Sequence, residues 1–179
     1  MLYCFGFESV AVVMSDLYFF DVAASDGQQG AERGVRLELR ALERDELLGS
    51  VYSAQPIGIG RPIWRVDLLE SVAGRPGSFD HTHHHPHFAG WEPQDRVFDR
   101  ELSNEPVDWV GRRLADLGGL LEEIGPEVPA VAPNDAASLK ASIPEILDAL
   151  RRLLARVHAG ELAKPPARQP AVTTRIGWL

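Results

Sequence analysis

The sequence predicts an α+β fold, in which an antiparallel β-meander of three to five strands is followed by two amphipathic helices packed on one face of the sheet. Strand-like segments occupy the first 70 residues and are joined by short connections, whereas helical periodicity begins only after residue 104. Such connections are too short for the crossovers of about a dozen residues that parallel strands need. With 179 residues, 45% of them hydrophobic and 25% charged, the chain is typical of one globular domain.

Four segments predict the strands of this meander. Residues 16–24 are rich in aromatic and β-forming side chains, and a turn follows them. In residues 35–41, Val, Leu, Leu and Ala alternate with Arg and Glu, which predicts a strand with one buried and one solvated face. Residues 47–54 and 63–69 predict two more strands, separated by a connection rich in Pro and Gly.

Two helices are predicted in the C-terminal part. The first begins near Asn104 or Glu105, has apolar residues at helical spacing, and stops at Gly125 before a proline. The second begins at Ser142-Ile-Pro-Glu145, which has the spacing of a capping box, and ends before Gly160.

These elements suggest a division of the chain into five parts. Because Met14-Ser-Asp looks like a second start, we interpret residues 1–15 as an N-terminal extension outside the core. The other parts are an α+β core (16–125), a Pro-rich connector (126–141), a C-terminal helix (142–160) and a tail (161–179).

Charge and cysteine content restrict the function classes. The net charge is −8, and residues 1–110 carry twice as many acidic as basic residues. An acidic body loses the counterion release that drives non-specific nucleic-acid binding, so we expect no extended DNA groove, although a small site for RNA or a nucleotide remains open. The single cysteine excludes an intramolecular disulfide, and no segment approaches the roughly 20 apolar residues of a membrane helix. We therefore expect a cytoplasmic protein without membrane association.

The most distinctive feature of the sequence is a cluster of five histidines between residues 81 and 87. In an extended segment, side chains alternate between two faces. The residues expected on one face, which are candidate ligands of a divalent transition metal, are His81, His83, His85 and His87.

The same cluster is suited to acid–base chemistry. An imidazole with a pKa near 6.5 exchanges a proton at neutral pH, a carboxylate can orient it, and an arginine can stabilise a phosphate. The candidate catalytic residues are His83, His85, Asp80 and Arg96. Asp67, Arg65 and Arg75 are further local candidates for the orienting carboxylate and the phosphate-stabilising arginine. The alternative is a solvated or packed histidine loop that binds metals only adventitiously.

Residues 63–121 resemble the TumE-like toxins of bacterial toxin–antitoxin systems. The resemblance rests on the order of a strand with Arg65-Val-Asp67, a histidine-rich segment, Arg96-Val-Phe98 and an amphipathic helix. It implies an intracellular enzyme that acts on RNA or nucleotides and is silenced by a cognate antitoxin, with His83, His85 and Arg96 as site residues.

A second function class stays open, namely a non-catalytic binding module. Residues 142–179 contain an amphipathic helix and end in the apolar segment Arg175-Ile-Gly-Trp-Leu179, which is costly to leave in water. This region would dock on the chain itself, bind a protein partner or form a homo-oligomer.

Overall fold

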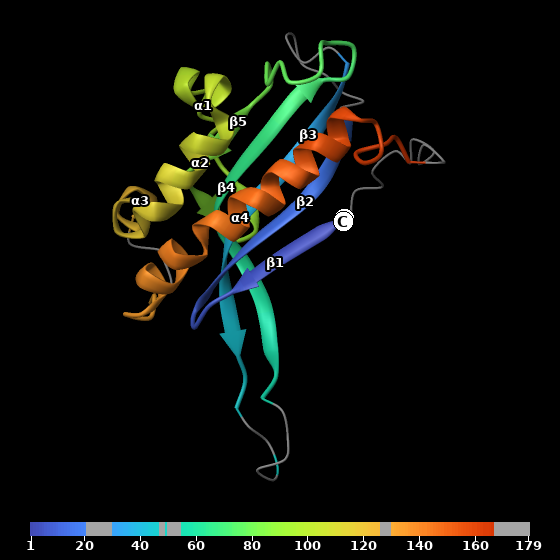
Figure 1. The fold of residues 1–179 in the computed structure, drawn as a ribbon. Coiled ribbons are helices and arrows are strands. Elements are labelled where there is room, and N and C mark those ends of the chain that lie inside the picture. Colours follow the sequence, from blue (N-terminus) through green and yellow to red (C-terminus); the bar gives the residue numbers. More distant parts are fainter. Residues whose placement is uncertain (21–29, 47–48, 50–54, 126–129, 167–179) are drawn as a thin grey trace, which may run out of the picture.

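The computed structural model describes residues 1–20, 30–46, 49, 55–125 and 130–166 (Figure 1). Five antiparallel strands lie side by side in chain order: β1 (Leu2–Gly6), β2 (Val10–Phe20), β3 (Ala31–Arg44), β4 (Ile57–Ser71) and β5 (His83–His85). A small hairpin follows, formed by β6 (Phe88–Ala89) and β7 (Glu92–Pro93). The helices are α1 (Arg100–Asn104), α2 (Pro106–Ala115), α3 (Leu117–Ile124) and α4 (Asp135–His158). The predicted α+β fold with an antiparallel meander is confirmed.

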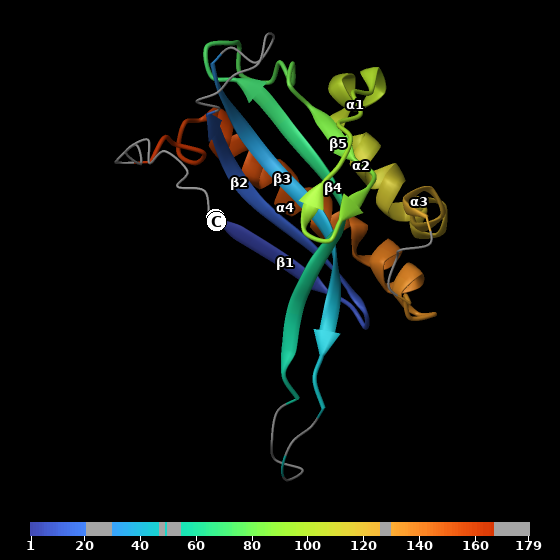
Figure 2. The same ribbon diagram turned by 180° about the vertical axis from the view of Figure 1, so that it is seen from behind.

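The two faces of the sheet differ in character. On β3, Val35, Leu37 and Leu39 are fully buried and pack in one core with apolar residues of α2 and α4. Arg36 and Glu38 alternate with them and therefore lie on the opposite face. Figure 1 shows α4 crossing the apolar face, and Figure 2 shows the β6–β7 hairpin in front of the other face. We call this second face the open face.

The N-terminal residues belong to the sheet. β1 pairs with β2, and β2 pairs with β3 from Val10 onwards. Val10, Val12 and Met14 are fully buried in the core. The predicted extension at 1–15 is therefore wrong, because these apolar residues complete the face that α4 covers.

The helix α4 begins earlier than the capping-box pattern predicts. Its first residue, Asp135, is buried and accepts hydrogen bonds from the backbone N–H groups of Glu8 and Ser9. Ser142 lies inside α4, where its hydroxyl donates to the carbonyl of Ser138, and Pro144 is also inside the helix. Residues 135–141 are thus helical and not part of a connector, since the link between Asp135 and the β1–β2 turn fixes an earlier start.

The first predicted helix is divided into α2 and α3. The break is at Asp116, whose carboxylate accepts a hydrogen bond from the backbone of Gly119 and so caps α3. The predicted strand at 47–54 lies outside the described residues apart from position 49, and so does most of the tail. None of the helices in the described ranges is long and apolar enough to cross a membrane.

Candidate functional site

The register of the central strands brings charged and histidine residues together on the open face. Asp67 of β4 lies opposite Arg36 of β3 on one side and His83 of β5 on the other. Arg65 is likewise the cross-strand neighbour of His85. Residues two apart on a strand share a face, so these side chains form two adjacent rows across the strands. One row contains Arg36, Asp67 and His83, and the other contains Arg65 and His85.

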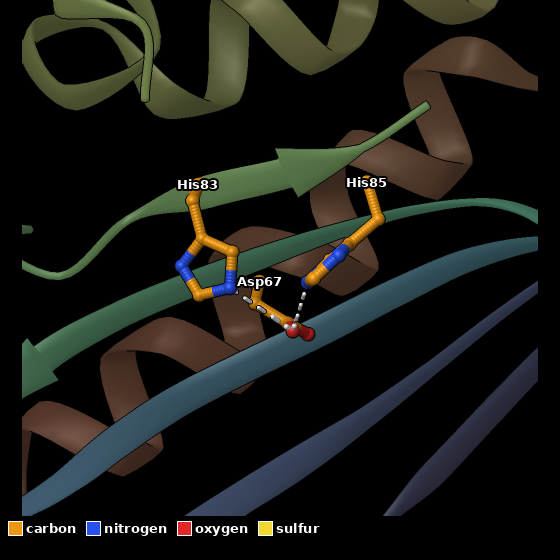
Figure 3. Close-up of side chains that lie close together, drawn as sticks. All are labelled: Asp67, His83 and His85. Carbon is orange, nitrogen blue, oxygen red and sulfur yellow. Dashed lines mark ion pairs between the residues drawn. The ribbon is translucent and has the colours of Figure 1, made fainter. Parts of the chain in front are cut away.

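Asp67, His83 and His85, which we call the Asp67 cluster, are in close proximity (Figure 3). The two imidazoles point from β5 towards Asp67, and each Nε2 atom lies 3.7 Å from its Oδ2 atom. One candidate ligand atom from each residue lies within 4.8 Å of the others. All three side chains are buried, so the cluster lies in a medium where charges interact strongly.

Two arginines already bind the acceptors of this cluster. Arg36 donates from Nε to Oδ1 of Asp67 at 2.8 Å and from Nη2 to Oδ2 at 3.3 Å, which is a bidentate pair. Arg65 Nε lies 3.1 Å from Oδ2 of Asp67, and Arg65 Nη2 lies 2.9 Å from Nε2 of His85. A guanidinium only donates, so His85 accepts this bond with the lone pair of Nε2.

The tautomer of His83 follows from its backbone partner. Its Nδ1 atom is 2.8 Å from the carbonyl oxygen of His81, and a carbonyl only accepts. Nδ1 therefore carries the proton, and in the neutral ring Nε2 has a lone pair on the side of Asp67. His83 is the imidazole of the cluster that can take up a proton without losing an existing hydrogen bond.

The pKa values of the cluster follow from burial and from the two arginines. For Asp67, burial favours the neutral acid, but the hydrogen bonds and charges of Arg36, together with the charge of Arg65, hold its pKa below the usual range. Burial lowers the pKa of His83 below 6.5. Burial and the charge of Arg65 lower the pKa of His85 to about 4. At neutral pH the cluster is thus a carboxylate with two neutral imidazoles.

The structure brings only part of the predicted catalytic set together. His83 and His85 are in the cluster, and the charge of Arg96 is close enough to lower the pKa of His83. Asp80 is elsewhere, because its carboxylate accepts hydrogen bonds from the backbone of Ser71 and the hydroxyl of Ser78.

The other histidines of the sequence cluster have different environments. His81 Nδ1 lies 2.8 Å from a carboxylate oxygen of Glu32, and His87 Nε2 lies 3.2 Å from the backbone carbonyl of Glu123. His84 points to the helix side, where its ring centroid is 5.1 Å from that of Trp109. Of the four predicted metal ligands, the structure therefore brings together His83 and His85.

Of the residues at the site, Asp67 and Arg65 were among the wider sequence-based candidates for acid–base chemistry, whereas Arg36 was not. Arg65 and Asp67 are two residues apart on the predicted strand 63–69 and therefore share a face. Arg36 lies on the polar face of the predicted strand 35–41. Pairing these two strands in a meander would have placed the three residues on one face, but the sequence does not specify the register.

Comparisons with protein-family models, with curated proteins and with solved structures found no match for this chain.

Proposed function

We propose that the Asp67 cluster is an acid–base site that binds a phosphate group of RNA and cleaves the adjacent phosphodiester bond. The observation that carries the proposal is the position of Arg65, which donates to His85 and lies beside Asp67. This guanidinium occupies the space between the carboxylate and the imidazole, where a bound cation would otherwise have to lie.

The charge balance around the cluster suits an anion. Arg36, Arg65 and Arg96 bring three positive charges, against the carboxylates of Asp67 and Glu38. A guanidinium matches the oxygens of a phosphate in a bidentate fashion. The Arg36 side chain is 30% exposed and Arg96 is exposed, so a ligand on the open face can reach guanidinium groups of the site.

In the proposed reaction, Nε2 of His83 takes the proton of a ribose 2′-hydroxyl. The 2′ oxygen forms a bond to phosphorus as the bond from phosphorus to the 5′ oxygen breaks, and the 5′ oxygen leaves with a proton from solvent. Guanidinium groups stabilise the negative charge that develops on the phosphoryl oxygens. The products are a 2′,3′-cyclic phosphate and a 5′-hydroxyl, and DNA is not a substrate because it lacks the nucleophile.

The resemblance of residues 63–121 to TumE-like toxins supports the same reaction class. It implies action on RNA or nucleotides, and its site residues His83, His85 and Arg96 are the ones at or near the cluster. In this proposal the acidic charge of the remaining chain restricts the contact to a few nucleotides.

The experiment is cleavage of end-labelled single-stranded RNA in excess EDTA by the wild type and by His83→Gln. We expect wild-type cleavage that leaves 2′,3′-cyclic phosphate ends, and a loss of roughly 100-fold or more in His83→Gln, since a positioned acid–base group contributes about that much. His87→Gln is the matched control, because this ring lies outside the cluster, and it should cleave as the wild type does. Intact RNA after incubation with the wild type would contradict the proposal.

A divalent transition metal is the second candidate ligand. The observation in its favour is the convergence of one ligand atom each from Asp67, His83 and His85 within 4.8 Å. In this alternative Arg65 would have to leave both His85 and Asp67, and its charge and that of Arg36 would oppose the ion. We therefore rank it below the phosphate site.

A further inference from the structure

We propose that Trp91 and Phe98 form two stacking platforms for nucleobases beside the Asp67 cluster, which makes unpaired RNA the substrate. This inference rests on the proposed function, because it assigns the bases that flank the phosphate at the cluster. Both rings are much more exposed than is usual for large aromatic side chains, 61% for Trp91 and 65% for Phe98. Exposed aromatic rings next to a basic site are the features by which proteins hold single-stranded nucleic acid.

Phe98 lies directly beside His83, the proposed general base. Its ring centroid is 5.4 Å from that of His83, with an angle of 45° between the planes. The preceding residue, Val97, exchanges two backbone hydrogen bonds with His84, of 3.0 and 2.9 Å, so this part of the chain is fixed to the edge of β5. Phe98 is thus held next to the cluster while most of its ring surface remains in water.

Trp91 lies in the turn of the β6–β7 hairpin, which covers part of the open face (Figure 2). The guanidinium carbon of Arg40 is 5.2 Å from the centroid of its ring. Arg40 is fixed in turn by hydrogen bonds to the carbonyl of Gly60 and to Glu38. One face of the indole is therefore supported by a cation, and the exposed surface is available to a base.

The two rings lie beside different rows of the sheet, which favours unpaired over paired nucleotides. Phe98 lies next to the row that contains Arg36, and Trp91 lies over Arg40, four residues farther along β3. Four residues of strand span about 13 Å. Successive bases in a duplex are only about 3.4 Å apart and hidden between their neighbours. Two separated rings on one surface therefore fit bases that are splayed from a single strand, with the phosphate between them near the guanidinium groups.

The test measures binding of a ten-nucleotide single-stranded RNA with 2′-O-methyl sugars, in which the nucleophile is blocked. Fluorescence anisotropy gives the Kd for the wild type, Trp91→Ala, Phe98→Ala and the conservative Trp91→Phe. We expect each alanine variant to weaken binding by about 5- to 100-fold, the effect of losing one base–aromatic stack, and Trp91→Phe to stay within about threefold of the wild type. A duplex of the same sequence should bind far more weakly and not respond to either alanine substitution.

Ile57→Ala is the matched control, because Ile57 is 56% exposed and lies at the far end of β4. It should leave the Kd unchanged. Equal Kd values for the wild type, Trp91→Ala and Phe98→Ala would overturn the inference, and so would a wild type that does not bind this RNA. If the wild type and the alanine variants bind as expected but the wild type does not cleave RNA with free 2′-hydroxyls, the stacking proposal is supported and the cleavage proposal is rejected. If the wild type cleaves RNA and both alanine variants bind and cleave RNA as the wild type does, the stacking proposal is rejected and the cleavage proposal is supported.

Discussion

At the scale of single residues, the site depends on a buried carboxylate that is fully paired. Asp67 is 2% exposed, and an isolated charge so far from water would be strongly disfavoured. The bidentate contact with Arg36 and the ion pair with Arg65 compensate for this loss of hydration. These contacts with Asp67 also hold the two guanidinium groups in place on the open face.

Three neighbouring histidines should make the folded protein sensitive to mild acid. The pKa values of His83, His84 and His85 are all lowered by burial, that of His85 to about 4. In the unfolded chain these groups take up protons near pH 6.5, so below this pH the unfolded state binds more protons than the folded state. Stability is therefore fully present above about pH 6.5 and decreases as the pH falls towards 4.

Urea unfolding at a series of pH values measures this effect. We expect the free energy of unfolding to decrease below pH 6.5 by up to about 1.4 kcal/mol per pH unit for His85 alone. His85→Gln should show a shallower slope, whereas His87→Gln, which lies outside the cluster, should retain the wild-type slope. A free energy of unfolding that does not change between pH 7 and pH 5 would show that the histidines are not held neutral.

The sequence predicted part of the site at this scale. Alternation within the histidine segment separated His83 and His85 from His84, and the structure places them on opposite faces of β5. Alternation also grouped His81 and His87 with the cluster, but β5 is only three residues long, so the alternation does not extend to them. Asp80 is adjacent in sequence but binds Ser71 and Ser78 instead.

At the scale of the elements, the site requires β3 and β4 to lie in a fixed register. At Gly34 there is no room for a side chain, because a Cβ atom there would lie 1.9 Å from the carbonyl oxygen of Leu68 on β4. This atom is backbone and cannot rotate away, so any side chain at Gly34 would push the strands apart. Gly34 is two residues from Arg36, and a displacement there would disturb its contact with Asp67.

Gly34→Ala should therefore be strongly destabilising. We expect a loss of about 2–4 kcal/mol in the free energy of unfolding, measured by urea denaturation, since the overlap is with backbone. Gly118→Ala is the control: nothing lies within 4 Å of the point that a Cβ atom would occupy there, the residue is in α3, and alanine is the better helix former. It should be neutral or slightly stabilising. A loss at Gly34 no larger than at Gly118 would mean that the strands do not approach as described.

The elements themselves were predictable to different degrees. The alternation of apolar and charged residues predicted β3, because one face of this strand is buried and the other is polar. The start of α4 was not predictable, because it depends on the buried contacts of Asp135 with Glu8 and Ser9, which are distant in the sequence. The capping-box spacing at Ser142 is matched in the sequence, but the continuing helix leaves no free N-terminus for it to cap.

At the scale of the whole molecule, the residues of the hydrophobic core and the residues of the proposed reaction lie on opposite faces of the sheet. The helices α2 and α4 and the apolar face of the sheet form the core, while the Asp67 cluster, Trp91 and Phe98 belong to the open face. The overall charge of −8 opposes binding to long nucleic acids, whereas the arginines on the open face create a local basic site. This combination is consistent with the short RNA contact that we propose.

The central claim, that the cluster is built for an anion, is tested most directly by calorimetric titration of tag-free protein at pH 7.5 and low salt. Inorganic phosphate and Zn²⁺ are titrated separately into the wild type, Arg36→Gln and the His83→Gln, His85→Gln double variant. We predict one phosphate per chain, weakened at least about tenfold in Arg36→Gln, because a charge-assisted bidentate contact is lost. Zinc uptake should be the same in the wild type and the double variant. One tightly bound zinc per chain that disappears in the double variant, without any binding of phosphate, would contradict the account.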